Sequence, residues 1–376
     1  MEFIFIIVLV FIVVKLEIFI FKKNSFKNFE YRCYFEKNEV MEGDEVDLIE
    51  VVENHKMMPL PWLKSEITSS KWLDFAGAQS IVTDETRFVP SFFMLKSYHK
   101  TTRRWHVKCL KRGVYPIDKV VVVTTDLFGS YNHSNVYNVN TSLTVLPAPA
   151  DLTNDFESAQ NLGGDVIVRR NYIDDPFYRA GVREYTPRDP LSRIHWLATA
   201  KANTLMVHNN QYTADQDLLV ILNVQSREYE NYLVIDKEKV ENGIKICAGF
   251  FEDTITSGIP VRFAANASLE DNRNPIISNS FHGDEHIADL MQTLAHIPLK
   301  SSDAFSVFLD GPCRELSASD IVIVTPYISD FIFDFAKDKM DSGSRVKIIY
   351  TSALTDENVP DGFSVFGYNG KENCVS

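Results

Sequence analysis

The sequence predicts a multidomain protein with an N-terminal transmembrane helix, an antiparallel β-sandwich domain and an α/β domain whose sheet is mostly parallel. Three observations indicate this order: an apolar stretch opens the chain of 376 residues, short β-rich runs separated by turn residues follow, and strand-like runs then alternate with helical ones. A chain of this length holds about two domains besides a membrane segment. The predicted boundaries are 1–28 for the anchor and its basic flank, 29–147 for the sandwich, 148–214 for a linker and charged segment, and 215–376 for the α/β domain.

The anchor is predicted from residues 3–21, which are apolar except for Lys15 and Glu17. Their length is close to the roughly 20 residues that a helix needs to cross the hydrocarbon layer. Lys15 can extend its amine toward the interface, whereas a carboxylate at Glu17 costs more. No Lys or Arg precedes the run and no Ala-x-Ala site ends it, which argues against a cleaved signal peptide. Because Lys22, Lys23 and Lys27 follow it, we expect a single-pass cell-membrane protein with its body in the cytoplasm.

Composition excludes some classes of function. The 51 acidic residues outnumber the 38 basic ones, and a net charge of -13 repels phosphate backbones, so general nucleic-acid binding is not expected. No GxxxxGK[ST] or GxGxxG motif occurs, which gives a phosphate-binding loop no support. The five cysteines show no zinc-type spacing and are expected to be reduced, buried thiols: Cys33, Cys109, Cys247, Cys313 and Cys374.

The sandwich is predicted from seven β-rich runs bounded by Gly, Pro, Asn and Asp. Along residues 104–109, polar and apolar side chains alternate, as expected for a strand with one buried face. Residues 42–45 and Gly129 mark turns, and we expect Trp62 and Phe128 to plug the ends of the sandwich. The runs cover residues 31–35, 46–52, 62–67, 88–93, 105–110, 120–125 and 137–146.

The α/β domain is predicted to follow a linker, because prolines at residues 147–151 and the Gly163–Gly164 pair interrupt any apolar period. Residues 218–222 form a continuous apolar run typical of a strand buried on both faces. A helix from about 234 to 256, ended by Gly258, comes next. Further strands at 259–263, 321–324 and 345–350 and helices at 285–295 and 331–340 complete the pattern. Repeated βα units imply a mostly parallel sheet covered on both faces.

Residues 183–207, the signature segment, crowd acidic, basic, His and Trp side chains between ordered regions. The segment resembles the signature of the domain-of-unknown-function 58 family, with Arg188 where that family usually has Gly. The matching positions are Tyr185, Asp189, Arg193, Ile194, His195, Trp196, Ala200 and 205–207, and the resemblance recurs at 41–46, 54, 59–62, 111–115 and 126–129. It implies a von Willebrand A-like arrangement of the α/β domain, a MoxR-type AAA+ ATPase as partner, and an assembly role at the bacterial cell envelope. Family members usually have two membrane helices, whereas one is predicted here.

Two hypotheses fit the signature segment, and they are compatible. As a structural clasp, Asp189 and Arg193 pair at i,i+4, Trp196 packs under the sheet, and His195 bonds a backbone carbonyl. As an interface, a basic face meets an acidic protein partner and Trp196 is a buried anchor. The candidate interaction residues are Arg183, Tyr185, Asp189, Arg193, His195, Trp196 and Lys201, with Arg188 adding to the basic face.

A degenerate metal site is predicted after the apolar run at 218–222. Von Willebrand A-type domains typically hold a divalent cation there with an Asp-x-Ser-x-Ser run, because such ions need hard, negatively charged oxygen ligands. This chain has Asn223, Gln225 and Arg227 at the three positions, and Arg227 is expected to set a cation near the vacant site. We therefore expect no metal, no cofactor and no enzymatic activity, and interpret the domain as a protein-binding scaffold.

The alternative is a metal-dependent enzyme or a cation-dependent adhesion module. His282 and His286 are four residues apart with acids between them, but Gly283 places His282 outside the expected helix. Ser192, His195 and Asp189 are the residue types of a hydrolase triad, yet true triads assemble from distant parts of a chain.

Overall fold

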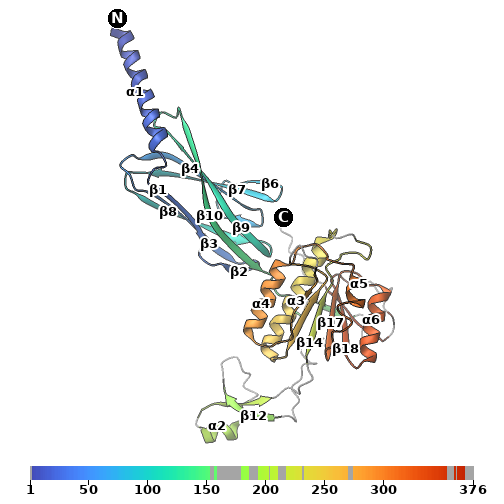
Figure 1. The fold of residues 1–376 in the computed structure, drawn as a ribbon. Coiled ribbons are helices and arrows are strands. Elements are labelled where there is room, and N and C mark those ends of the chain that lie inside the picture. Colours follow the sequence, from blue (N-terminus) through green and yellow to red (C-terminus); the bar gives the residue numbers. More distant parts are fainter. Residues whose placement is uncertain are drawn as a thin grey trace. The chain divides into compact units, whose positions relative to one another are not determined.

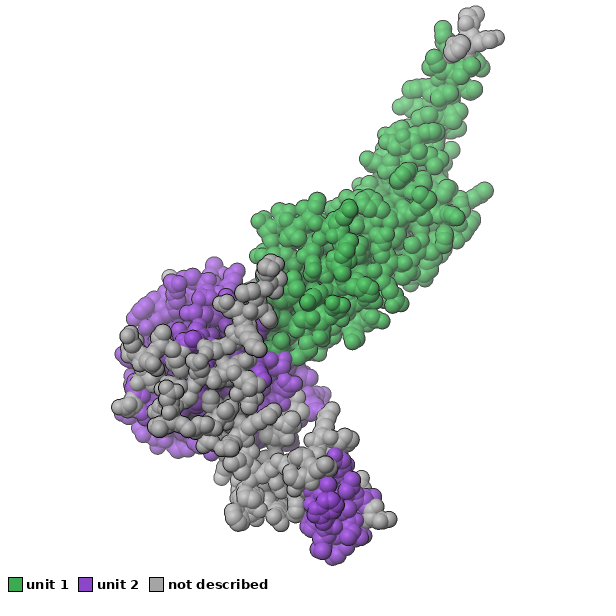
Figure 2. Space-filling model, turned by 180° about the vertical axis from the view of Figure 1, so that it is seen from behind, with its two compact units in different colours: residues 1–148 green, residues 149–376 purple. Residues whose placement is uncertain are grey.

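The computed structural model describes residues 2–152, 156–158, 179–185, 194–202, 204–210, 217–230, 233–269, 274–353, 360 and 362–368. The chain divides into two compact units, Met1–Ala148 and Pro149–Ser376 (Figure 2). The first carries the apolar helix and an all-β body, and the second carries the α/β body. We call them the N-terminal and C-terminal units.

Helix α1 (Glu2–Asn24) is long and apolar enough over Ile4–Asn24 to cross a membrane. Its side chains from Ile4 to Val13 are exposed, as those of a lipid-facing helix are, and Lys22 and Lys23 lie in its last turn. Only four residues separate its end from the first strand (Figure 1).

Two sheets form the body of the N-terminal unit. One has the order β1–β3–β8–β5 and the other β2–β10–β9–β4–β7–β6. All neighbours pair antiparallel except β2 and β10, which run parallel. The strands are β1 (Phe29–Phe35), β2 (Glu39–Met41), β3 (Glu45–Asn54), β4 (Leu60–Ser70), β5 (Leu73–Phe75), β6 (Ile81–Thr83), β7 (Thr86–Leu95), β8 (Lys100–Cys109), β9 (Gly113–Thr125) and β10 (Asn132–Leu146). Each of the seven predicted runs overlaps one of them.

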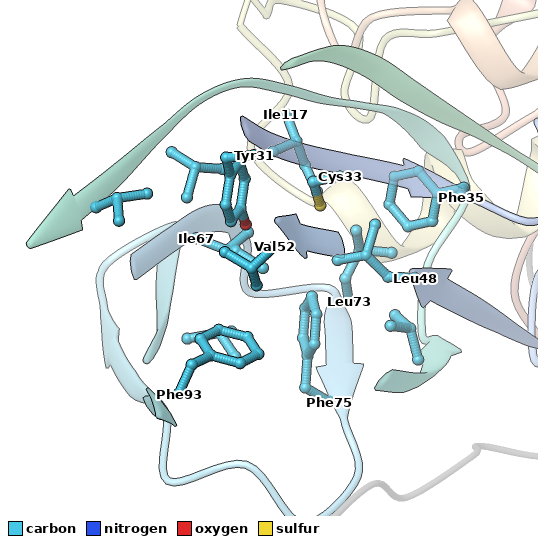
Figure 3. Close-up of a cluster of buried hydrophobic side chains, with 14 of the residues drawn as sticks. Tyr31, Cys33, Phe35, Leu48, Val52, Ile67, Leu73, Phe75, Phe93 and Ile117 are labelled. Atoms are coloured by element: carbon cyan, nitrogen blue, oxygen red, sulfur yellow. The ribbon is translucent and has the colours of Figure 1, made fainter. Parts of the chain in front are cut away.

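The sandwich core is apolar and draws on both sheets. Phe35 and Phe75 enter from β1 and β5, while Phe93 and Ile117 enter from β7 and β9 (Figure 3). Burying such aromatic and aliphatic side chains contributes roughly 1.5–3 kcal/mol each. Cys33 and Cys109 lie among these side chains as free, buried thiols. Cys247 and Cys313, in the C-terminal unit, are also free and buried.

One carboxylate is fully buried in this core. Glu50 on β3 accepts hydrogen bonds from Tyr31 Oη at 2.8 Å, Ser91 Oγ at 2.6 Å and Trp105 Nε1 at 3.3 Å, and from Ser65 Oγ. Buried charge is tolerated only when it is hydrogen-bonded in this way. Burial, reinforced by the charge of Glu50, raises the pKa of Tyr31 well above its ordinary value, so the phenol stays a donor.

Two expected core plugs are not in the core. Trp62 and Phe128 are each 62% exposed, so the prediction that they close the sandwich ends is wrong. Trp62 lies at a register shift between Leu60 and Leu63, both of which are buried. An extra residue at a bulge reverses which side chains face inward, and this leaves Trp62 outside.

The C-terminal unit is built on a seven-stranded mixed sheet of order β11–β19–β18–β17–β14–β15–β16. Strands β14, β15, β17, β18 and β19 run parallel, and β11 and β16 are antiparallel edges. Helices α3 and α4 cover one face, and α5 and α6 the other (Figure 1). The bounds are β11 (Phe156–Ser158), β14 (Leu218–Leu222), α3 (Lys237–Ser257), β15 (Val261–Ala265), β16 (Ile276–Ile277), α4 (Asp284–His296), α5 (Phe305–Asp310), β17 (Asp320–Thr325), α6 (Asp330–Asp341), β18 (Arg345–Tyr350) and β19 (Ser364–Tyr368).

Most predicted elements of this unit are confirmed. Strand β14 is buried at every position, as the continuous apolar run requires. Helix α3 is capped by Asp236 and ends at Gly258, whose φ of 69° is the left-handed conformation that glycine adopts without strain. The expected stripe of α4, which includes Ile287 and Leu290, is buried.

Candidate functional site

The site begins where the strand order of the sheet reverses. Strand β14 pairs with β15 on one side and with β17 on the other, and all three run parallel. In open α/β sheets, ligands bind outside the carboxyl ends of the strands at such a switch point. Asn223 directly follows β14, and Thr325 is the last residue of β17, so both lie at this position.

Asn223 is fully buried and uses its amide in protein contacts. Its Nδ2 donates to Thr325 Oγ1 at 3.1 Å, and its Oδ1 accepts the backbone N–H of Gln225 at 2.9 Å. Its own backbone N–H donates to the carbonyl of Val324 at 2.9 Å. The side chain therefore joins the ends of the two central strands.

Gln225 and Asn266 extend this amide network. Gln225 Nε2 donates to the carbonyl of Glu230 at 3.0 Å, and its Oε1 accepts the N–H of Phe305, the first residue of α5, at 2.6 Å. Asn266, after β15, accepts the N–H of Val224 at 2.7 Å and donates to the carbonyl of Asp303 at 3.3 Å. Three buried amides thus tie together the loops at this edge of the sheet.

Glu230 closes the loop after β14. It is buried, and its carboxylate accepts the N–H of Ser226 at 2.6 Å, the Ser226 hydroxyl at 2.7 Å and the N–H of Ile235. Burial, helped by the charges of Glu228 and Glu230, raises the pKa of the adjacent Tyr327 to about 12, although its contact with Asn223 lowers it. The phenol is consequently neutral across the physiological range.

The structure separates the three residues that define the degenerate metal site. Asn223 and Gln225 lie together in the buried network, whereas Arg227 is exposed at the surface. A divalent cation is held by oxygen ligands with negative charge. Both oxygen atoms that the two amides could offer already accept backbone N–H groups. The arrangement suits a rigid loop platform better than an ion cage.

The signature segment forms a small hairpin with a helix. Strand β12 (Arg179–Glu184) pairs antiparallel with β13 (Met206–Asn210), which places Arg183 opposite Val207. The N–H of Tyr185 donates to the carbonyl of Leu205 at 2.8 Å, and that of His195 to Met206 at 2.7 Å. Ile194 is buried and bridges Val207 from the other side.

Helix α2 (Trp196–Ala202) is fastened to β13 by two side chains. Thr199 Oγ1 accepts the N–H of Met206 at 2.9 Å, and His195 Nδ1 accepts the N–H of Ala198 at 3.2 Å. The imidazole therefore caps the first turn of α2, where unpaired N–H groups need an acceptor. The expected bond between His195 and a backbone carbonyl stays a prediction.

Trp196 does not pack under a sheet. It is 70% exposed, its neighbour Leu197 is also exposed, and none of the residues of α2 is buried. The expectation of a buried Trp196 is therefore wrong. Among the described residues of this segment, Ile194 and Val207 are the buried apolar ones. Lys201 is exposed on the same helix.

The other signature residues, Arg188, Asp189, Ser192 and Arg193, lie outside the described residues. The expected Asp189–Arg193 pair and the arrangement of Ser192, His195 and Asp189 fall there as well. Of the candidate interaction residues, Tyr185, His195, Trp196 and Lys201 have described side chains, and Arg183 is described in its backbone.

Two groups of residues contain His and other side chains of the types that bind metal ions. His286 lies on α4 and its Nε2 contacts the carbonyl of Val261 at 3.0 Å, while His282 precedes the helix, as expected. In the N-terminal unit, ligand atoms of Glu30, Glu53 and His55 lie within 4.8 Å of one another.

That second group is better explained by ion pairing. Glu53 pairs with Arg32 and with Lys100, whose Nζ lies 3.0 Å from it. The hydrogen bond from Lys100 is the largest cause that lowers the pKa of Glu53. Sequence patterns missed this group because its members come from β1, the end of β3 and the loop after it.

An antiparallel β-sandwich and a doubly wound α/β sheet thus define the class of this two-unit protein. Residues 181–361 match the family model described as "Protein of unknown function DUF58". This match confirms, over residues 181–361, the resemblance to the DUF58 family that the signature segment predicted. No curated protein matches the sequence.

Several solved structures resemble part of the chain. A non-cellulosomal cohesin from Archaeoglobus fulgidus is 10% identical, with 31% of this chain and 91% of that chain covered and a TM-score of 0.21. Domains D2 and D3 of the major pilin SpaD from Corynebacterium diphtheriae are 12% identical, with 37% and 66% covered and a TM-score of 0.24. The α2-macroglobulin of E. coli is 16% identical, with 44% and 8% covered and a TM-score of 0.22. Similarities of this size carry no argument about function.

Proposed function

We propose that this protein is a membrane-anchored, non-enzymatic scaffold that binds other proteins, acting with a MoxR-type AAA+ ATPase in assembly or maturation at the bacterial cell envelope. In this proposal α1 spans the cell membrane once and the two units lie in the cytoplasm, because Lys22, Lys23 and Lys27 follow the apolar span. The ATPase partner and the role at the cell envelope are proposed because the family resemblance implies them.

A von Willebrand A-like arrangement of the C-terminal unit is part of this proposal. Counted along the chain from β14, six strands lie in the order 3-2-1-4-5-6, the doubly wound order in which ligands meet the sheet at its switch point. The closed amide network at Asn223 and Gln225 supports contact with proteins in place of cation binding.

The observation that carries the proposal is the exposure of Trp196. Trp196 is of a residue type that is enriched at interaction hot spots, and Leu197 and Lys201 are exposed on the same helix. Large exposed apolar groups on a fold that does not need them for packing mark interaction surfaces. Because Thr199 fastens α2 to β13 and His195 caps its first turn, this surface is held in one orientation on β13.

The test is recovery of the partner from native membranes. We expect the full-length protein, crosslinked and then solubilised in detergent, to recover an AAA+ ATPase identified by mass spectrometry. A Trp196→Ala/Leu197→Ala variant should lose that ATPase while keeping its thermal unfolding midpoint. Tyr229→Ala, which removes an exposed aromatic residue elsewhere in the C-terminal unit, is the matched control.

Three results would contradict the proposal. If no AAA+ ATPase is recovered, the proposed partner is wrong, and if the double variant recovers it unchanged, the surface around Trp196 is not the binding site. Calorimetry that detects a stoichiometric Mg²⁺ site abolished by Asn223→Ala would favour the metal-dependent alternative.

A further inference from the structure

Three loops gather at the end of the sandwich where α1 joins β1, which we call the helix-proximal end. Strand register places them there, because Phe29 pairs with Asn54, Glu53 pairs with Lys100, and Trp62 pairs with Thr125. The loops are residues 55–59 between β3 and β4, 96–99 between β7 and β8, and 126–131 between β9 and β10. Asn54 Nδ2 donates to the carbonyls of Met58 and Lys96, which fastens the first two loops together.

Helix α1 is joined rigidly to this end. Phe21, in its last turns, is only 3% exposed and belongs to the sandwich core. Ser25 Oγ lies 2.5 Å from His133 Nδ1, and the Phe26 ring packs edge-on against Phe29. With no flexible linker between helix and sandwich, a membrane that surrounds α1 must lie directly against the helix-proximal end.

The loop at residues 126–131 runs alongside the helix. The backbone N–H of Leu127 points to Glu17 Oε1 at 3.5 Å, and Figure 1 shows the β9–β10 hairpin reaching up beside α1. Along the helix, Val14, Glu17, Ile18 and Phe21 are the less exposed positions, and their spacing places them on one side. Glu17 precedes the helix end at Asn24 by seven residues, so at about 1.5 Å per residue the loop climbs roughly 10 Å along α1.

That height brings the loop into the bilayer. The span Ile4–Asn24 has 21 residues, hardly more than the roughly 20 that cross the hydrocarbon core. If the edge of the hydrocarbon core lies at Lys22, the loop tip is immersed in that core. If the edge lies at Lys15, the loop tip lies in the headgroup interface. In both cases the loop tip lies within the membrane or its interface.

The side chains at this end suit a lipid surface. Leu127 and Phe128 are exposed at the loop tip, and Met57, Tyr98 and Trp62 are exposed beside it. Aromatic rings of Trp and Tyr concentrate at membrane interfaces. The exposed amines of Lys22, Lys23, Lys27 and Lys96 surround them, which suits anionic headgroups.

The loop tip is also pre-formed. Asp126 is fully buried, and its Oδ1 accepts the N–H groups of Ser130 at 2.6 Å and Tyr131 at 3.0 Å. Gly129 completes the turn with a φ of 70°. Leu127 and Phe128 are therefore held outward by the turn, so no ordering cost accompanies their insertion.

We propose that the helix-proximal end of the sandwich docks on the bilayer, with Leu127 and Phe128 inserted into the interface beside α1. The docking rests on the proposed membrane span of α1. The occupant is the lipid surface itself, because the same unit already delivers the helix to it. Amphipathic elements of this kind penetrate about 5–10 Å past the headgroup boundary.

The experiment measures how deeply labelled positions of the full-length protein lie in the bilayer. An environment-sensitive fluorophore is attached at Phe128→Cys, Val10→Cys or Ile81→Cys, each in a Cys374→Ser background, since Cys33, Cys109, Cys247 and Cys313 are buried. Each protein is reconstituted in nanodiscs of phosphatidylcholine and phosphatidylglycerol with brominated or ordinary acyl chains. Ile81 is the matched control, because it is an exposed apolar residue far from the helix-proximal end. It pairs with Phe88 on β7, and Phe88 is seven residues, or roughly 23 Å along the strand, from Leu95 at that end.

We expect brominated lipid to quench the labels at Phe128 and Val10 several-fold more strongly than the label at Ile81. A label at Leu127→Cys should repeat the result for Phe128. Quenching at Val10 without quenching at Phe128 or Leu127 would overturn the docking and leave the anchor intact. Quenching at none of these positions would overturn both the membrane span of α1 and the docking.

Discussion

Asn223 donates its amide N–H to the hydroxyl of Thr325 across 3.1 Å and so joins the carboxyl ends of β14 and β17. Thr325 in turn donates to the carbonyl of Tyr327 at 2.7 Å, which continues the chain of bonds into the next loop. A carboxylate in place of Asn223 would lack the N–H that this chain needs. The network therefore depends on an amide at this position.

Asn223→Asp should destabilise the C-terminal unit. The substitution sets an uncompensated charge at a fully buried position, which costs about 3 kcal/mol. Chemical denaturation monitored by circular dichroism measures the loss, with the exposed Asn279→Asp as control. Recovery of the lost stability on addition of millimolar Mg²⁺ would show that the loops can still form a cation site, contrary to this prediction.

Glu50→Gln should weaken the sandwich. Glu50 accepts four side-chain hydrogen bonds, and an amide can accept only through its oxygen, so two donors compete with its own NH₂ group. The expected loss is about 1–3 kcal/mol in the free energy of unfolding. Glu66→Gln on strand β4 of the other sheet, where the carboxylate pairs with Lys64 at the surface, should change stability little. Equal effects of both variants in urea denaturation would count against a special role for the buried carboxylate.

Lys56→Met should stabilise the protein at neutral pH. Burial lowers the pKa of Lys56 to about 8, so the charged amine is disfavoured in the folded state. Between pH 8 and about 10.4, the ordinary lysine pKa, the unfolded chain binds more protons than the folded one, and the stability of the wild type rises with pH. Because the amine is only partly buried, we expect a gain of about 1 kcal/mol at pH 7.

The measurement for Lys56 is a series of thermal unfolding midpoints from pH 7 to 10 in detergent. At pH 7 the unfolding midpoint of the variant should be higher than that of the wild type. Above pH 8 the midpoint of the variant should not show the rise that is expected for the wild type. The exposed Lys96→Met in the neighbouring loop is the control. A wild-type midpoint that falls in parallel with the variant through this window would refute the assignment.

Thr199→Val should loosen α2 without unfolding the C-terminal unit. The substitution removes the hydroxyl that accepts the N–H of Met206, a bond worth about 1 kcal/mol. Amide exchange at Met206 should accelerate roughly five-fold while that of β14 is unchanged. Thr204→Val, at an exposed neighbouring position, should leave exchange at Met206 as it is. An equal acceleration in both variants would contradict the role of Thr199 in fastening α2 to β13.

Sequence patterns predicted the elements that are governed by local periodicity. The continuous run of β14 and the apolar stripe of α4 were identified because burial on two faces, or on one helical side, leaves a repeating signal. Strands β2, β5 and β6 were missed because three residues are too few to show alternation. Helix α5 was missed for a related reason, since its six residues span less than two turns.

The environment of the large aromatic residues was not predictable from local pattern. Trp62, Phe128 and Trp196 were assigned to interiors because such residues are usually buried, yet all three are exposed. Their exposure depends on a bulge, on a tight turn and on a helix of seven residues. In the candidate site, the positions of Asn223 and Gln225 after an apolar run identify them, whereas Asn266 and Glu230 belong to no motif. Only the fold brings Asn266 to the backbone of Val224 and Glu230 to Gln225.

Phe21 makes the last turns of α1 a structural part of the sandwich, and this has a mechanical consequence. A helix in a thinner bilayer adjusts to it chiefly by leaning away from the membrane normal. Without a hinge between helix and sandwich, such leaning rotates the whole N-terminal unit by the same angle. In the proposed single-pass arrangement, the thickness of the surrounding lipid is thereby converted into the direction in which the sandwich points.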